Sequence, residues 1–254
     1  MARASAIAAA TVAAALWLGA PGVRAEPPVD PSGGLPITID AASRIDAGER
    51  ELKLRFGFER TDGGRNAIVA DPEVELSLAR GLSVSVAPSY TFGSAEDADR
   101  GDVGFQLEYN LVEPRDGGFG LTIQPEITLP YGSGDEAAQF ELMLLASRGL
   151  GTGKDAPRLH VNLAWRHLVD ADPDERADRT FAAVGASLPV GGATALVLDL
   201  VREPARGRDE VDKLVEAGLR HSIAEGFVLA GGAGVGLGPD SPDFRLLLGL
   251  QRAF

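Results

Sequence analysis

The chain contains 254 residues, carries a formal net charge of −13 and contains no cysteine. An acidic chain without basic clusters is not expected to bind nucleic acid, and the absence of cysteine excludes disulfides, thiol chemistry and cysteine-based metal sites. Beyond Ala25 no apolar run approaches the roughly 18 residues of a membrane-spanning helix, so a helical membrane protein is excluded. A soluble periplasmic protein or a β-barrel remains.

Residues 1–25 have the pattern of a secretory signal peptide. Arg3 supplies a positive start, residues 6–20 form an Ala-rich apolar stretch, and Val23 and Ala25 are small residues at the two positions that a signal peptidase reads. The apolar stretch is about 15 residues long, which is too short for a membrane anchor. We therefore predict that the chain is exported and cleaved after Ala25.

Residues 26–48 are rich in Pro, Gly and Asp. This composition predicts a flexible periplasmic lead-in to the folded domain. The segment could instead fold back as a plug, and the sequence leaves both arrangements open.

From Glu51 onward, apolar and polar residues alternate with a period of two, which is typical of amphipathic β-strands. About twelve such segments follow one another, an even number as in bacterial single-chain barrels. Each has about 9–11 residues, the length of a tilted strand that crosses a bilayer. The predicted strands begin near Glu51, Glu73, Leu82, Val103, Phe119, Gln139, Leu159, residue 180, Leu196, Val215, Phe227 and Phe244.

The predicted connections are alternately short and long, as in barrels with short periplasmic turns and longer external loops. An even strand number then places both termini in the periplasm. Aromatic residues concentrate near both ends of the predicted strands, where membrane proteins carry girdles of amphipathic rings. The expected outer girdle contains Phe58, Phe92, Phe105, Phe140, Trp165, Phe181 and Phe244, and the inner one Tyr109, Phe119, Phe227 and Phe254.

A soluble β-sandwich or a lipocalin-like barrel would also show alternation, but with its apolar face inward and a surface rich in Lys and Glu. Here the polar face contains Gln, Asn, Ser, Thr and Gly as well as charges. We therefore predict an all-β fold in which residues 49–254 form an antiparallel up-and-down transmembrane β-barrel in the outer membrane of a Gram-negative bacterium. The terminal aromatic Phe254 predicts recognition by the barrel-assembly machinery, and lipid and lipopolysaccharide are expected as further partners.

The polar face of such a barrel lines its lumen. Opposite charges on neighbouring strands, such as Lys53 and Glu73, can pair across the ladder. They either satisfy a buried polar wall or form a constriction that selects a solute. The predicted lumen-lining residues are Lys53, Arg55, Glu73, Glu75, Glu108, Gln124, Glu126, Glu141, His160, Asn162, Arg166, Glu216, Arg220 and Arg245.

Motifs for catalysis and metal binding are incomplete. Asp170 to Asp174 starts like a calcium loop, but Glu175 replaces the required Gly. His167 and His221 are expected near the membrane interfaces without a serine that could act as a nucleophile beside His167. We predict no enzyme activity, no metal site and no cofactor.

Two glycine-rich stretches do not complete a phosphate loop. Gly149 to Lys154 is preceded by Arg148 where a P-loop has its first Gly, and Asp155 replaces the Ser or Thr. Gly232 to Gly238 lies within a predicted strand, which indicates close packing or a bend in the barrel wall.

Six stretches carry a resemblance to a known family. They are GERELKLRFGFER, PEVELSLARGLSVSVAPSY, GDVGFQLEYNLVEP, LTIQPEITLPYGSGD, LHVNLAWRH and FRLLLGLQRAF. In this layout the chain resembles the outer-membrane family labelled "MetA-pathway of phenol degradation". The resemblance implies a transporter-like barrel associated with uptake of small aromatic or apolar compounds, and it carries over no binding or catalytic residue.

The sequence thus predicts an outer-membrane channel or transporter-like barrel through which small solutes pass passively. Aromatic or apolar solutes follow from the resemblance alone. A non-conducting structural barrel and a lipid-modifying enzyme are the alternatives.

Overall fold

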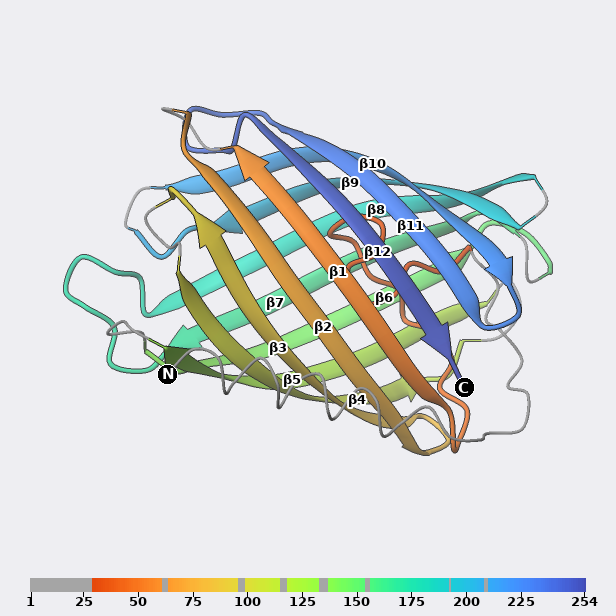
Figure 1. Ribbon diagram of the computed structural model, residues 1–254. Coiled ribbons are helices and arrows are strands. Elements are labelled where there is room, and N and C mark those ends of the chain that lie inside the picture. Colours follow the sequence, from red (N-terminus) through yellow and green to blue (C-terminus); the bar gives the residue numbers. More distant parts are fainter. Residues whose placement is uncertain are drawn as a thin grey trace.

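The computed structural model describes residues 29–60, 64–95, 99–114, 118–132, 137–153, 156–191, 193–207 and 210–254. In these ranges each strand pairs antiparallel with its neighbours in sequence, and β1 pairs with β12 to close a barrel (Figure 1). The strands are β1 (Arg50–Arg60), β2 (Asn66–Ala79), β3 (Leu82–Gly93), β4 (Arg100–Val112), β5 (Phe119–Gly132), β6 (Gln139–Gly149), β7 (Arg158–Leu168), β8 (Asp178–Gly191), β9 (Thr194–Pro204), β10 (Val211–Ala224), β11 (Phe227–Gly236) and β12 (Phe244–Ala253). This confirms the predicted twelve-stranded, all-β, up-and-down barrel. None of the described residues belongs to a helix long and apolar enough to cross a membrane.

The side chains alternate between the outer surface and the interior. In β7, His160 and Asn162 are buried, whereas the intervening Val161 is exposed. In β12, Leu248 is 65% exposed and Gln251 only 3%. The apolar face therefore points outward and the polar face inward, which is the reverse of a soluble β-barrel and confirms the predicted orientation.

Strand β2 begins earlier than predicted. The sequence pattern places its start near Glu73, but the strand starts at Asn66. The ladder with β3 pairs Ala70 with Tyr90 and Val74 with Val86 but is interrupted between these pairs, where Pro72 and Pro88 lie opposite each other. Proline has no N–H to donate, which explains the interruption of the ladder at this pair. The strand nevertheless continues through Pro72, because β2 stays in register with β1 there. The local sequence at Pro72 indicated a loop instead.

The two ends of the barrel differ. Glu51 pairs with Ala253, so β1 starts and β12 ends at the same end, which we call the terminal end. At the opposite end, the loop end, the Phe58 and Phe244 rings lie 5.6 Å apart and the Phe140 and Trp165 rings 5.8 Å apart. These pairs belong to the aromatic girdle that the sequence predicts at this end.

Phe181 departs from that girdle. It is 4% exposed and faces the interior, because the β7–β8 register sets it beside Ala164, whose side chain also faces inward. The small residues of β8 gave no clear alternation, so its facing could not be deduced from sequence. The prediction of Phe181 as a membrane-facing girdle residue was wrong.

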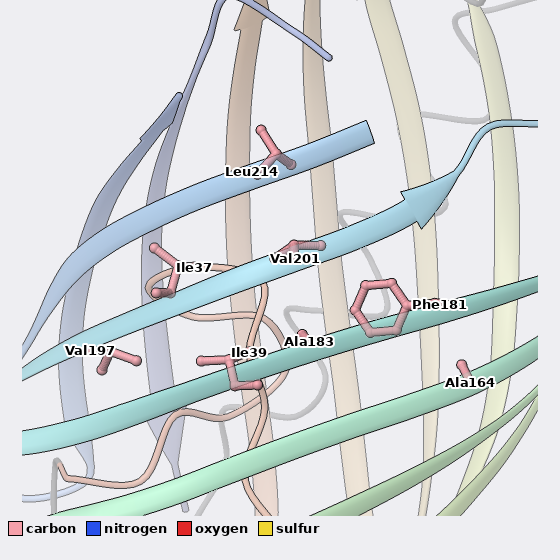
Figure 2. Close-up of a cluster of buried hydrophobic side chains, with 8 residues drawn as sticks. All are labelled: Ile37, Ile39, Ala164, Phe181, Ala183, Val197, Val201 and Leu214. Carbon is pink, nitrogen blue, oxygen red and sulfur yellow. The ribbon is translucent and has the colours of Figure 1, made fainter. Parts of the chain in front are cut away.

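Residues 29–48 run from the barrel interior, where residues 29–43 are buried or half-buried, to the start of β1, where Arg44, Ala47 and Gly48 are exposed (Figure 1). We call them the lumen segment. Leu35, Ile37 and Ile39 are fully buried, and Ile37 and Ile39 pack on an apolar patch of the inner wall (Figure 2). The wall residues of this patch are Ala164, Phe181, Ala183, Val197, Val201 and Leu214.

The lumen segment corrects the expectation of a flexible lead-in for its described part. Burying an isoleucine side chain contributes about 1.5–3 kcal/mol, and Ile37 and Ile39 both gain that burial by entering the barrel. The plug arrangement, which the sequence left open, is the one observed. The predicted signal peptide, residues 1–25, lies outside the described residues.

Candidate functional site

The lumen segment follows the inner wall from strand to strand. Its backbone N–H groups donate to wall side chains, so that buried donors are satisfied without a β-ladder. The wall therefore offers hydrogen-bond acceptors to an extended chain that crosses the middle of the lumen. The bonds run from Thr38 to Glu216 Oε2 (3.0 Å), from Ile39 to Asp199 Oδ2 (2.8 Å), from Asp40 to Asn162 Oδ1 (2.7 Å) and from Ala42 to Ser147 Oγ (2.8 Å).

Glycines make room for the segment on β10, β11 and β12. A Cβ on Gly218 would lie 2.6 Å from Pro36 Cγ, and one on Gly232 would lie 2.5 Å from Ile37 Cγ2. No side chain fits at these distances, so glycine is required where the segment touches the wall. Gly232 thus fulfils the close packing that the sequence predicted for its glycine-rich stretch.

Two buried arginines hold the first part of the segment. Arg158 Nη1 donates to Asp30 Oδ2 at 2.7 Å, and both side chains are buried. Arg220 Nη1 donates to the Leu35 carbonyl at 2.9 Å, and its Nη2 donates to Gln251 Oε1 at 2.7 Å. Removing one partner of a buried ion pair costs about 3–5 kcal/mol, so these contacts fix the position of the segment.

Lys53 forms the centre of a charged cluster on the opposite wall. It is only 5% exposed, and its Nζ lies 2.9 Å from Glu75, 3.1 Å from Glu73 and 3.4 Å from Glu51. Lys53 has only one ammonium for three carboxylates, so the cluster carries a net negative charge when all three are ionised.

The wall towards the loop end carries arginines paired with carboxylates. Arg166 forms ion pairs with Glu141 and Glu203, and its guanidinium lies 5.0 Å from the centre of the Phe181 ring. Arg245 Nε donates to Glu59 at 2.9 Å. Arg55 pairs with Asp71 and donates to the Gly33 carbonyl at 3.2 Å. These arginines therefore present little uncompensated positive charge to the lumen.

In the part of the barrel that the structure describes, two cavities lie against the lumen segment. The larger, of about 540 Å³, lies towards the loop end, and Arg55, Glu126, Arg166 and Arg245 contribute to its wall. The smaller, of about 70 Å³, surrounds Lys53 and its carboxylates. The two cavities share five lining residues, which are Gly33, Asp40, Glu73, Gln106 and Gln124. The cavities therefore adjoin beside the lumen segment.

The predicted lumen-lining residues all have buried or half-buried side chains. Ten of them line one or both of the cavities, namely Lys53, Arg55, Glu73, Glu75, Glu108, Gln124, Glu126, Glu141, Arg166 and Arg245. Behind the lumen segment lie His160, Asn162, Glu216 and Arg220, three of which bond to it.

Several residues of this site were missing from the predicted set. Asp30 and Asp40 belong to the segment that the sequence indicated to be flexible, and Asp199 and Glu203 were not singled out within β9. The alternation of Ile37 and Ile39 with polar neighbours, which resembles a short strand, was the available signal for the segment.

The histidines do not form an accessible catalytic site. Ser147 Oγ lies 2.8 Å from His160 Nδ1, which is the spacing of a nucleophile and its base. However, both side chains are buried, and Ser147 Oγ already accepts the N–H of Ala42. On the outer surface, His167 lies 3.0 Å from Asp178 and His221 2.8 Å from Thr194. Among the described residues, no group of three or more His, Asp or Glu side chains is arranged to hold a metal ion.

Comparison with solved structures identifies similar barrels. The crystal structure of the COG4313 outer membrane channel from Pseudomonas putida F1 matches with a TM-score of 0.60 and 14% identity over 89% of this chain and 99% of that one. The KdgM porin in complex with disordered oligogalacturonate gives a TM-score of 0.58 and 11% identity over 80% and 99%. The NanC porin gives 0.57 and 10% over 79% and 98%.

The chain has the fold of an outer-membrane β-barrel. At these identities the likeness shows the fold alone. No family model matches the chain, and no curated protein matches it. The specific resemblance to the "MetA-pathway of phenol degradation" family is therefore not confirmed, although the expected outer-membrane architecture is.

Proposed function

We propose that this protein is an outer-membrane channel for the passive passage of small solutes, with both termini in the periplasm. The observation that carries the proposal is a closed barrel with an apolar exterior and a cavity of about 540 Å³ lined by charged and polar side chains. A wall that only sealed the barrel would be expected to fill this space with side chains. The volume lies in the range of small-molecule sites.

The chemistry of the lining bears on the solute. The family resemblance implied aromatic or apolar compounds. The larger cavity is instead bordered by Arg55, Arg166 and Arg245 and by their carboxylate partners. Displacing the water around such groups is costly unless the solute replaces its hydrogen bonds. We therefore favour small polar solutes, and aromatic ones where they carry polar substituents.

A non-conducting structural barrel is the second candidate. It is supported by the lumen segment, which fills much of the β6–β12 side of the interior. Single-channel recording of the full chain in planar bilayers separates the two functions. Discrete conductance steps from protein whose gel migration shifts on heating support the channel. Folded protein that stays silent contradicts the channel and favours the structural role.

Phe254 supports assembly of the same barrel. Its N–H donates to the Arg50 carbonyl at 2.9 Å, so it extends the contact between the first and last strands. The Arg252 guanidinium lies 5.3 Å from the centre of its ring. We infer that Phe254 is the residue through which the barrel-assembly machinery and the surrounding lipid engage this end. Phe254→Ala should reduce the amount of folded barrel in outer-membrane extracts.

A further inference from the structure

The lumen segment is anchored mainly on one side of the barrel. Four of its N–H groups donate to β6, β7, β9 and β10, and most of the glycines that lie closely against it are on β8, β10, β11 and β12. One further glycine, Gly120 at the start of β5, lies close to the Ala42 carbonyl. On β4, it contacts Asn110, which accepts the N–H of Ile45 at 3.3 Å. Asn110 itself donates its N–H to Gly81 in a turn at the terminal end. At mid-lumen the opposite wall therefore makes fewer contacts with the segment, and these come from Lys53 and Arg55 of β1.

The two cavities adjoin on this opposite side. Of the lining residues that they share, Gly33 and Asp40 belong to the lumen segment, and Glu73, Gln106 and Gln124 belong to β2, β4 and β5. A direct path from one cavity to the other would therefore run between the segment and these three strands.

Lys53 narrows this path. Its Cδ lies only 2.7 Å from the position that a Cβ on Gly33 would take, so the lysine stem packs against the segment. Its ammonium is held by Glu73 and Glu75, which lie on the adjacent strand β2. Lys53 is thus the cation placed between the anchored segment and the carboxylates of the wall.

We propose that solutes pass the lumen segment on its β1–β5 side while the segment stays docked, and that Lys53 sets the width and the charge preference of this constriction. The inference rests on the proposed channel function and specifies the path within it. The competing path requires the whole segment to leave the lumen, which would deprive four buried or part-buried N–H groups and two buried isoleucines of their partners.

A disulfide that locks the segment separates the two paths. The position of a Cβ on Gly249 lies 3.0 Å from Leu35 Cγ, so the two Cβ atoms would lie within about 4.5 Å, which suits a disulfide. The natural chain contains no cysteine, so Leu35→Cys with Gly249→Cys can form only this bond within one molecule. Neither residue lines either of the two cavities described above.

Single-channel conductance is measured for the same preparation before and after reduction. We expect equal conductance in both states and close to that of the natural chain. Conductance that is absent in the oxidised protein and appears on reduction would show that the segment must move, and would overturn the inference. Silence of the natural chain itself would instead refute the proposed channel, so the two failures are distinguishable.

Substitution of Lys53 tests the constriction itself. Lys53→Ser shortens the side chain and leaves the carboxylates without their cation, so we expect larger conductance in KCl and a several-fold increase in the preference for potassium over chloride. Lys53→Gln keeps a hydrogen-bond donor for Glu73 and Glu75 and should shift the ion preference even if the serine variant folds poorly. Lys213→Ser removes the same charge from an exposed site outside both cavities and is the matched control. Lys53 variants that match this control in conductance and ion preference would refute the role of Lys53.

Discussion

Asn162 and Asp40 exchange two hydrogen bonds. The Asp40 N–H donates to Asn162 Oδ1 at 2.7 Å, and Asn162 Nδ2 donates to the Asp40 carbonyl at 2.9 Å. A side-chain amide of the barrel wall thus pairs with the backbone of the lumen segment as a neighbouring strand would. The pairing shows how a chain without a β-ladder of its own is held across the lumen.

Asn162→Ala should loosen the lumen segment without unfolding the barrel. The substitution leaves the N–H and the carbonyl of Asp40 without these partners, at a cost of about 2 kcal/mol. Hydrogen exchange of the amides around Asp40 should therefore accelerate roughly 30-fold, if exchange occurs through local opening. Val161→Ala alters the outward-facing neighbour and serves as the control. Equal exchange rates in the two variants would contradict this account of Asn162.

Gly232→Ala and Gly231→Ala form a matched pair on the two faces of β11. A methyl group at residue 232 would collide with Ile37, whereas one at residue 231 meets Leu248 Cδ2 at 3.4 Å, an ordinary contact. We expect Gly232→Ala to weaken docking of the segment by about 1–3 kcal/mol and Gly231→Ala to leave it unchanged. Protection of the Ile37 amide from exchange measures both effects. If the Ile37 amide in Gly232→Ala stayed as protected from exchange as in the natural chain, the wall at residue 232 would be shown to tolerate a side chain.

Charge substitutions in the larger cavity should change ion selectivity in opposite directions. Arg166→Gln frees Glu141 and Glu203 of their cation and should shift the reversal potential in a KCl gradient towards cation preference. Glu126→Gln removes a carboxylate and should shift it the other way. Both shifts should shrink at high salt because ions screen the wall charges. Arg202→Gln changes an exposed arginine and is the control. Shifts of the same sign would mean that these groups do not act through the field in the pore.

Docking of the lumen segment should depend on pH through Asp40. Burial raises the pKa of Asp40 from 3.8 to about 6, despite the nearby Lys53 and the N–H groups of Ala41 and Gly33, and Glu73 acts in the same direction as burial. The docked segment therefore binds the proton more tightly than the free one. Docking is therefore strongest below about pH 4, and its free energy becomes less favourable by up to about 3 kcal/mol as the pH rises through 6.

Amide exchange of the segment between pH 4 and pH 8, corrected for the intrinsic rate, measures this dependence. Asp40→Asn removes the titrating group and should flatten the curve. A curve that keeps its full slope in Asp40→Asn would assign the effect to another carboxyl group.

The barrel could be predicted from sequence because a strand that separates lipid from a polar lumen must alternate at every residue. Leu248 and Gln251 show the pattern within one strand, and it recurs across most of the chain. The prediction from this pattern was wrong at two places. At Pro72, a residue typical of loops lies within a strand. At Phe181, the small neighbouring residues do not show which face of β8 points inward.

The position of the lumen segment could not be predicted because its partners are scattered. Asn162, Asp199 and Glu216 lie on three different strands, and each contributes one bond. No local stretch of sequence contains more than one of them, so no periodicity or motif shows where the lumen segment binds on the wall. The glycines of β11 were the clearest local sign, but they show only that something approaches closely.

The apolar patch beneath Ile37 and Ile39 has a consequence for an emptied barrel. Without the segment, the apolar side chains of Val197 and Leu214 would be exposed to water in a lumen whose other walls are charged. The exposed apolar patch would then favour rebinding of the segment. A synthetic peptide covering residues 33–42, added to a barrel that lacks the segment, should therefore bind in trans and restore the conductance of the natural chain. The barrel would then behave as a split protein whose two fragments recognise each other.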